Sequence, residues 1–122
     1  MSTKTINIIN WLLAALVAFI FIGSAFGKLT ANADALKMAE NFGISAKTFT
    51  ILGIVEIISV VLFLIPRTAV LGTLLLVAYM GGAIATHVQH NQPIMAPIMI
   101  AAFVWIVAVI RLPELRSRLF GK

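Results

Sequence analysis

The chain has 122 residues, of which 61% are hydrophobic and 11% are charged, and its mean hydropathy is +1.09. A water-soluble domain of this length needs polar faces on most of its helices, so this excess of apolar side chains indicates a chain that faces lipid. The net charge of +5 comes from basic residues at the ends of apolar runs, which excludes a basic nucleic-acid-binding face. Without cysteine, the chain has no disulfide, thiolate metal site or covalent haem attachment.

Four apolar stretches follow one another along the chain, at residues 8–27, 49–65, 69–88 and 94–110. Each reaches the roughly 17 apolar residues that a membrane-crossing helix needs. Helices are expected because the bilayer core offers backbone groups no hydrogen-bonding partner. The short connections between the last three stretches make these antiparallel neighbours. The sequence therefore predicts a single all-α domain over residues 1–122, an integral membrane four-helix bundle.

The connection between the first two stretches is the longest, and it has a water-facing composition. Residues 32–42 within it have the pattern of a short amphipathic helix. Its apolar residues can share one face (Ala35, Leu36, Met38, Ala39 and Phe42), and its polar residues turn away (Asp34, Lys37, Glu40 and Asn41). Gly43 is suited to end this helix. We expect it to lie at the membrane interface over one end of the bundle, with a frayed polar loop as the alternative.

The basic residues favour one orientation of the bundle. Four crossings place both termini on one side, with six basic residues (Lys4, Arg67, Arg111, Arg116, Arg118 and Lys122). The other side has three (Lys28, Lys37 and Lys47), partly offset by two acidic residues. The positive-inside rule therefore predicts that both termini are cytoplasmic.

Glu56 is the most informative residue, because it lies near the middle of the second apolar stretch. A carboxylate at that depth costs several kcal/mol, so it must face the interior of the bundle, be paired, or be protonated. Membrane carboxylates often mark ligand or proton sites, but an interhelical hydrogen-bonding role explains Glu56 equally well.

Two further polar groups are expected at the same end of the bundle as Glu56. Lys28 ends the first stretch and has a side chain long enough to reach inward. His87 closes the third stretch, and Tyr79, Thr86 and His87 fall on one helical stripe. We therefore expect one inward-facing polar cluster, while the alternative is that Lys28 and His87 are ordinary interfacial residues.

Metal binding is only weakly indicated. His87 and His90 are three residues apart, but two imidazoles without a third ligand do not define a metal site. The small residues are interpreted as packing contacts, because the Gly23/Gly27 pair and the strip that starts at Gly81 and Gly82 would let helices approach closely.

Several motifs resemble those of a known family. In chain order they are Phe21-Ile22-Gly23-Ser24-Ala25-Phe26-Gly27-Lys28-Leu29, Leu52-Gly53-Ile54-Val55-Glu56, Leu64-Ile65-Pro66-Arg67-Thr68, Gly81-Gly82-Ala83-Ile84-Ala85-Thr86-His87 and Arg111. Their order and spacing, over nearly the whole chain, resemble the DoxX-like family of small bacterial membrane proteins.

This resemblance implies a four-helix bundle in a bacterial inner membrane, with Lys28, Glu56 and His87 as the shared polar positions and Arg111 next. The founding members of the family are small subunits linked to a thiosulfate:quinone oxidoreductase, and relatives are associated with quinones or oxidative stress. The resemblance assigns no chemistry to these residues.

Three functions are compatible with these features. The first is an accessory or redox-linked membrane component that binds a quinone between its helices, with electrons supplied by a partner protein or bound cofactor. The second is a non-enzymatic assembly factor or structural subunit. The third is a proton-coupled small-molecule transporter, although in small multidrug exporters the membrane carboxylate lies in the first helix rather than the second. Enzymatic activity and assembly as a homo-oligomer stay open.

Overall fold

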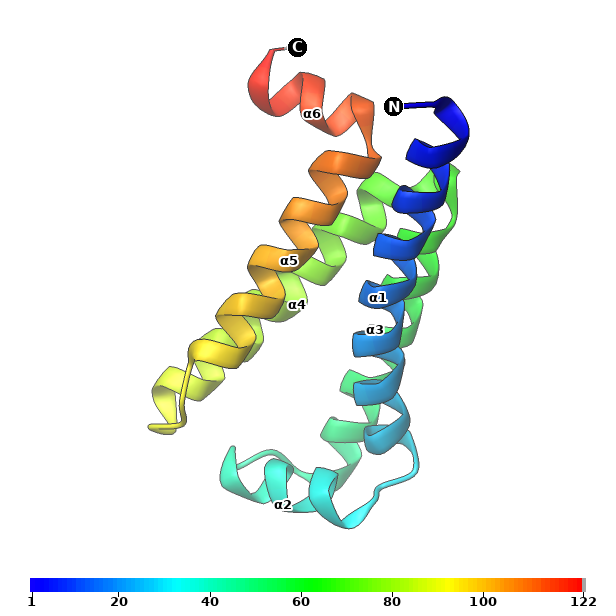
Figure 1. The fold of residues 1–122 in the computed structure, drawn as a ribbon. Coiled ribbons are helices and arrows are strands. Elements are labelled where there is room, and N and C mark those ends of the chain that lie inside the picture. The colour runs from blue at the N-terminus through cyan, green and yellow to red at the C-terminus, as the bar shows by residue number, and fades with distance from the viewer. Residues whose placement is uncertain (122) are drawn as a thin grey trace.

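The computed structural model describes residues 1–121, and this part of the chain is helical without strands (Figure 1). The elements are α1 (Thr3–Leu29), α2 (Ala33–Asn41), α3 (Ala46–Leu64), the short 3-10 helix η1 (Pro66–Thr68), α4 (Ala69–Gln89), α5 (Met95–Arg111) and α6 (Pro113–Phe120). The four apolar stretches seen in the sequence correspond to α1, α3, α4 and α5.

Two helices begin several residues before their apolar stretches because serine side chains cap them. The Ser2 hydroxyl accepts a hydrogen bond from the backbone N–H of Thr5 at 3.2 Å, which starts α1 at Thr3. The Ser45 hydroxyl accepts one from the backbone N–H of Thr48 at 3.1 Å, which starts α3 at Ala46. Such caps satisfy backbone donors that the first helical turn leaves without partners.

The helices differ in whether they are long and apolar enough to cross a membrane. Among the described residues, α1, α3 and α4 together with η1 are long and apolar enough to cross a bilayer. The shorter α5 has 17 residues and is followed, after a bend of 104°, by α6. The fold therefore has three candidate membrane spans, or four if the bent α5–α6 pair counts as one.

The helices form two pairs that spread apart toward one end. In sequence order, α1 packs against α3, α3 against α4 and α4 against α5, while α1 and α5 make a smaller contact. Both termini and α6 lie at one end of the molecule, and α2 lies at the other (Figure 1). The α1–α3 pair and the α4–α5 pair are closest near the termini and diverge toward α2 (Figure 1).

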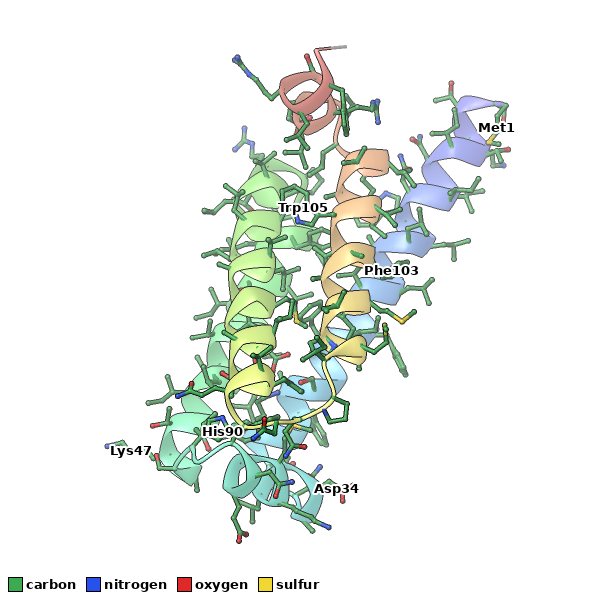
Figure 2. The ribbon with its side chains drawn as sticks, turned by 90° about the vertical axis from the view of Figure 1, so that its left-hand side faces the viewer. Met1, Asp34, Lys47, His90, Phe103 and Trp105 are labelled. Atoms are coloured by element: carbon green, nitrogen blue, oxygen red, sulfur yellow. The ribbon has the colours of Figure 1, made fainter. Side chains whose placement is uncertain are left out.

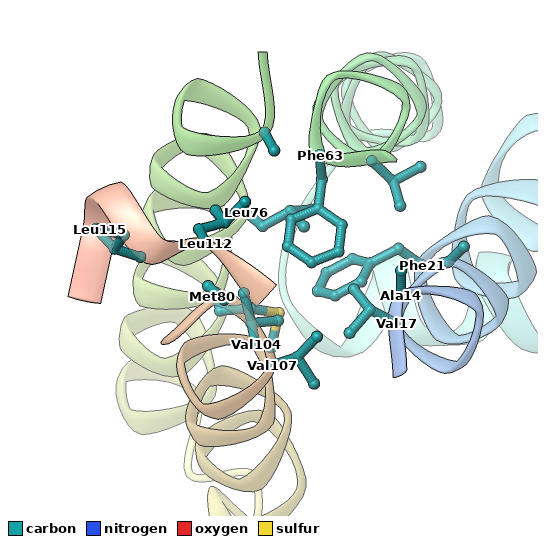
Figure 3. Close-up of a cluster of buried hydrophobic side chains, with 14 residues drawn as sticks. Ala14, Val17, Phe21, Phe63, Leu76, Met80, Val104, Val107, Leu112 and Leu115 are labelled. Carbon is teal, nitrogen blue, oxygen red and sulfur yellow. The ribbon is translucent and has the colours of Figure 1, made fainter. Parts of the chain in front are cut away.

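The hydrophobic core lies in the half of the molecule nearer the termini. Its largest fully buried apolar side chains are Phe21 on α1, Phe63 on α3 and Leu76 on α4. Val104 and Val107 of α5 are buried in the same cluster (Figure 3). This core holds the four long helices together at one end, so the space between the diverging helix pairs lies at the other end.

Close helix packing depends on two glycines that sequence analysis did not single out. A Cβ at Gly72 of α4 would lie 2.1 Å from the backbone nitrogen of Phe63, so only glycine fits against α3 there. A Cβ at Gly53 of α3 would lie 3.0 Å from the Cβ of Lys28 on α1. Gly72 and Gly53 thus set the approach of α3 to its two neighbours.

The expected packing role of the other glycines is wrong. A Cβ at Gly23, Gly81 or Gly82 would meet no heavy atom within 4 Å. A Cβ at Gly27 would meet only the side chain of Asn32, in the turn that follows α1. These motifs lie on helix surfaces that the neighbouring helices do not cover, and a glycine pair by spacing alone does not reveal which helix face is packed.

The amphipathic segment between α1 and α3 forms the predicted helix α2. Asn32 caps its start by accepting a hydrogen bond from Ala35 N–H at 2.8 Å, and Gly43, just beyond its end, has a φ of +65°. Its inner face consists of Ala35, Ala39 and Phe42. Leu36 and Met38 are exposed, so only three of the five residues expected on this face are buried. In Figure 2, Asp34 lies at the outer edge of this end of the molecule.

Helix α6 was not predicted from the sequence. It starts with Pro113 at its first position and ends at Gly121, whose φ is +70°. Proline and glycine are typical start and stop residues, but eight residues that include charged side chains give no long apolar run. Residue 122, one of the six basic residues used to predict the orientation, lies outside the described part of the chain.

Candidate functional site

A cavity of about 450 Å³ lies between the two diverging helix pairs, in the half of the molecule nearer α2. Side chains from α1, α2, α3, α4 and α5 line it, and most of them are apolar. Phe21 and Met80 belong to both the hydrophobic core and the cavity wall, and Met38 of α2 and Phe42, just after α2, line the opposite side. Its polar lining residues are Ser24, Lys28, Glu56, Tyr79, Thr86 and His87.

The polar centre of this cavity is a buried ion pair. The Nζ atom of Lys28 lies 2.8 Å from Oε1 of Glu56. Lys28 is 8% exposed and Glu56 is 1% exposed, so water screens neither charge effectively. The pairing offsets the cost of each buried charge, because either one alone would face a poorly polarisable surrounding.

Ser24 completes a hydrogen-bonded triangle with this ion pair. Lys28 Nζ donates to the Ser24 hydroxyl at 2.5 Å, and this hydroxyl donates to Glu56 Oε1 at 3.2 Å. Ser24 and Lys28 face the same way because they are four residues apart on α1. Among the described residues, no buried side-chain nitrogen or oxygen is left without a hydrogen-bond partner.

Two aromatic rings flank the Lys28 ammonium group. Its Nζ lies 5.1 Å from the ring centroid of Phe49 and 6.0 Å from that of Tyr79, within the range of cation–π attraction. The site thus combines one charge pair with a hydroxyl and two aromatic faces.

His87 lines the same cavity but has no hydrogen bond or ion pair to Lys28 or Glu56 in the described part of the chain. Its Nδ1 atom lies 2.6 Å from the backbone oxygen of Ala83. Because a carbonyl oxygen can only accept, Nδ1 carries the hydrogen, and Nε2 of the neutral ring is then an acceptor. The ring of Phe42 packs on His87 at 4.6 Å between centroids, so α2 covers this side of the cavity.

The remaining expected residues have local roles. Thr86 lines the cavity, but its hydroxyl donates to the Gly82 carbonyl at 2.8 Å within α4. His90, labelled in Figure 2 at the α2 end, lies with its ring 6.2 Å from that of Phe42.

No group of three His, Cys, Asp or Glu side chains is placed to hold a metal ion within residues 1–121.

Arg111 lies at the other end of the molecule, far in sequence and fold from this cavity. Its guanidinium donates to the backbone oxygen of Phe63 at 3.2 Å. The same group lies 4.9 Å from the ring centroid of Phe63 and 5.4 Å from that of Trp11. Arg111 therefore joins α1, α3 and α5 near the termini rather than contributing to the polar cluster.

Three cavity residues were missed as candidates by sequence analysis: Ser24, Phe42 and Phe49. A signal for Ser24 was present, because it lies one helical turn before Lys28. Phe42 was expected on the apolar face of the amphipathic segment, but nothing there indicated contact with His87. Phe49 gave no signal, since an apolar residue in an apolar segment carries no mark of a neighbouring charge.

Comparison with known proteins gives one match. A family model described as the DoxX-like family matches residues 12–110, which is most of the chain. No curated protein and no solved structure matches the chain. The matched range contains all the polar cavity residues.

Proposed function

The chain belongs to the DoxX-like family, and from this premise we propose that it is a small membrane component that binds a quinone-like ligand between its helices. The observation that carries the proposal is the cavity of about 450 Å³ with the buried Lys28–Glu56 pair in its wall. Sites for small ligands typically have volumes of roughly 300–1,000 Å³, an apolar lining and a few converging polar groups.

The polar groups are complementary to a quinone head group in both redox states. A quinone carbonyl accepts hydrogen bonds, and Lys28 and Tyr79 supply donors at the cavity wall. A hydroquinone hydroxyl donates, and Nε2 of His87 supplies an acceptor. Glu56 is placed to accept or return a proton as the ligand changes redox state. Electrons would come from a membrane or redox partner protein.

Filling the cavity should abolish this binding. We expect Gly82→Phe to weaken binding of decylubiquinone to the purified protein about tenfold or more, since its ring would occupy the cavity that the head group needs. The substitution is compatible with the backbone, because a Cβ at Gly82 meets no heavy atom within 4 Å. Binding can be measured by isothermal titration in detergent.

Gly81→Phe is the matched control. Gly81 is adjacent on α4, is equally open to a Cβ and does not line the cavity, so this variant should bind like the unmodified protein. Equal affinities for the two variants, or no binding by the unmodified protein, would contradict the proposed ligand site.

We also propose that α1, α3, α4 and α5 cross a bacterial inner membrane as a four-helix bundle with both termini in the cytoplasm. The positions of the two termini at one end support an even number of crossings. In intact cells, cysteines at Ser2 and Ser117 should resist an impermeant thiol reagent, while one at Asn32 should react. The chain has no native cysteine that would react with the reagent. Labelling of either terminus from outside would refute this orientation.

One observation favours a second function, that of a structural or assembly subunit. Ser24, Lys28 and Glu56 satisfy one another without a ligand, as a cluster that only locks α1 to α3 would require. In that case Glu56→Gln would leave a cellular phenotype such as quinone sensitivity intact. The ligand-binding proposal expects that phenotype to be lost while the protein still inserts and folds.

A further inference from the structure

Helix α6 turns sharply away from the helix that precedes it. The bend between α5 and α6 is 104°, and Leu112 at the junction is extended and buried. Figure 1 shows α6 over the end of α5, at the same end of the molecule as the N-terminus. If α5 runs through the bilayer, a helix at this angle lies roughly parallel to the membrane plane.

One side of α6 is apolar and only partly covered. Leu115 is buried against the hydrophobic core, which orients this side toward the other helices. Leu119 and Phe120 are 49% and 61% exposed, so they extend the apolar side beyond the protein. Arg116 folds back and donates to the carbonyl oxygens of Val109 and Ile110 at 2.8 and 3.1 Å. The apolar side therefore continues past the edge of the protein at the depth where α5 ends.

Charge is distributed unequally between the two ends of the described chain. The α6 end has five basic residues and one acidic residue, a net charge of +4 (Lys4, Arg67, Arg111, Arg116 and Arg118, with Glu114). The α2 end has two of each, a net charge of zero (Lys37 and Lys47, with Asp34 and Glu40). Arg67 and Arg118 are exposed and have no ion-pair partner among residues 1–121.

From these observations we infer that α6 lies in the membrane interface and binds anionic phospholipids. Leu119 and Phe120 enter the acyl region beside α5, and Arg67 and Arg118 contact head-group phosphates. An interfacial helix of this kind gains from apolar burial and from attraction to anionic lipid together. The charge complementarity selects an anionic lipid surface over an apolar protein partner. This inference does not depend on the ligand of the cavity.

The position of α6 can be measured with single cysteines in the full chain. A fluorophore at Leu119→Cys, in liposomes of equimolar phosphatidylcholine and phosphatidylglycerol, should be quenched by nitroxide-labelled lipid. The same fluorophore at Ser117→Cys, on the opposite side of α6, should be quenched by aqueous iodide instead. Equal lipid quenching at both positions would overturn the inference. So would protection of Leu119→Cys from both quenchers, which would show that protein covers it.

Lipid selectivity can be measured on the same liposomes. The unmodified protein should retain phosphatidylglycerol over phosphatidylcholine after detergent extraction, as quantified by mass spectrometry. The Arg67→Gln/Arg118→Gln variant should lose this preference by roughly fivefold for each basic residue removed. The Lys37→Gln/Lys47→Gln variant loses the same charge at the other end and should retain the preference. An equal loss in the two variants would show a net-charge effect only and would overturn the inference.

Discussion

Replacing Lys28 by methionine is expected to destabilise the folded protein by about 3–5 kcal/mol, the usual cost of removing one partner of a buried ion pair. Methionine keeps most of the side-chain volume but leaves the Glu56 carboxylate, which is 1% exposed, without its counter-charge. The Ser24 hydroxyl would remain its only hydrogen-bonding neighbour in the triangle. Thermal or denaturant unfolding in a mild detergent, followed by helical circular dichroism, measures the change.

The double variant Lys28→Met/Glu56→Gln separates loss of the ion pair from loss of packing. It removes both charges while Gln keeps a hydrogen-bonding group of similar shape, so most of the lost stability should return. Glu56→Gln alone should be much less destabilising than Lys28→Met, because glutamine keeps the shape and hydrogen-bonding capacity of the side chain and can still accept from Lys28. If Lys28→Met unfolds like the unmodified protein, Glu56 carries a proton and the pair is not ionic.

The second large effect is expected at Gly72. A Cβ there would lie 2.1 Å from the nitrogen and 2.4 Å from the Cα of Phe63, so Gly72→Ala must push α4 away from α3. Overpacking of this kind costs about 3 kcal/mol or more when rigid backbone is the obstacle, because no side chain can move aside. The neighbouring core around Phe63 and Leu76 would be opened by the same shift.

Gly81→Ala is the control on the same helix. Its Cβ would meet no heavy atom within 4 Å, and alanine favours a helix over glycine by up to about 1 kcal/mol. We therefore expect this variant to be as stable as the unmodified protein or slightly more so. Comparable destabilisation by the two alanine substitutions would show that α3 and α4 do not pack as described.

The helices and the most unusual charge could be read from the sequence. The apolar runs behind α1, α3, α4 and α5 are long, and their number and order require only hydropathy and length. Glu56 is conspicuous because a carboxylate inside an apolar run needs a partner. The amphipathic spacing of α2 gave the inner positions of Ala35, Ala39 and Phe42, but it did not show that Leu36 and Met38 are exposed.

The position of α6 and the roles of the glycines depend on how the helices pack against one another, which the local sequence does not show. A short polar segment such as α6 resembles many loops until its bend against α5 is known. The glycines show the same limit: Gly81 and Gly82 look like a packing strip, whereas Gly72 and Gly53 make the close contacts. Spacing places residues on one face, but only the neighbouring helix determines whether that face is packed.

Composition and hydropathy are enough to predict an all-α chain for an apolar surrounding, with Glu56 in need of a partner. The packing of the helices brings Lys28 and Ser24 to Glu56, places His87 in the same cavity without contact to the pair, and opens the cavity between diverging helix pairs. The two kinds of feature depend on interactions of different range. Hydropathy and helical period act between near neighbours in the chain, whereas a cavity and an ion pair between residues 28 apart depend on the angle at which helices cross.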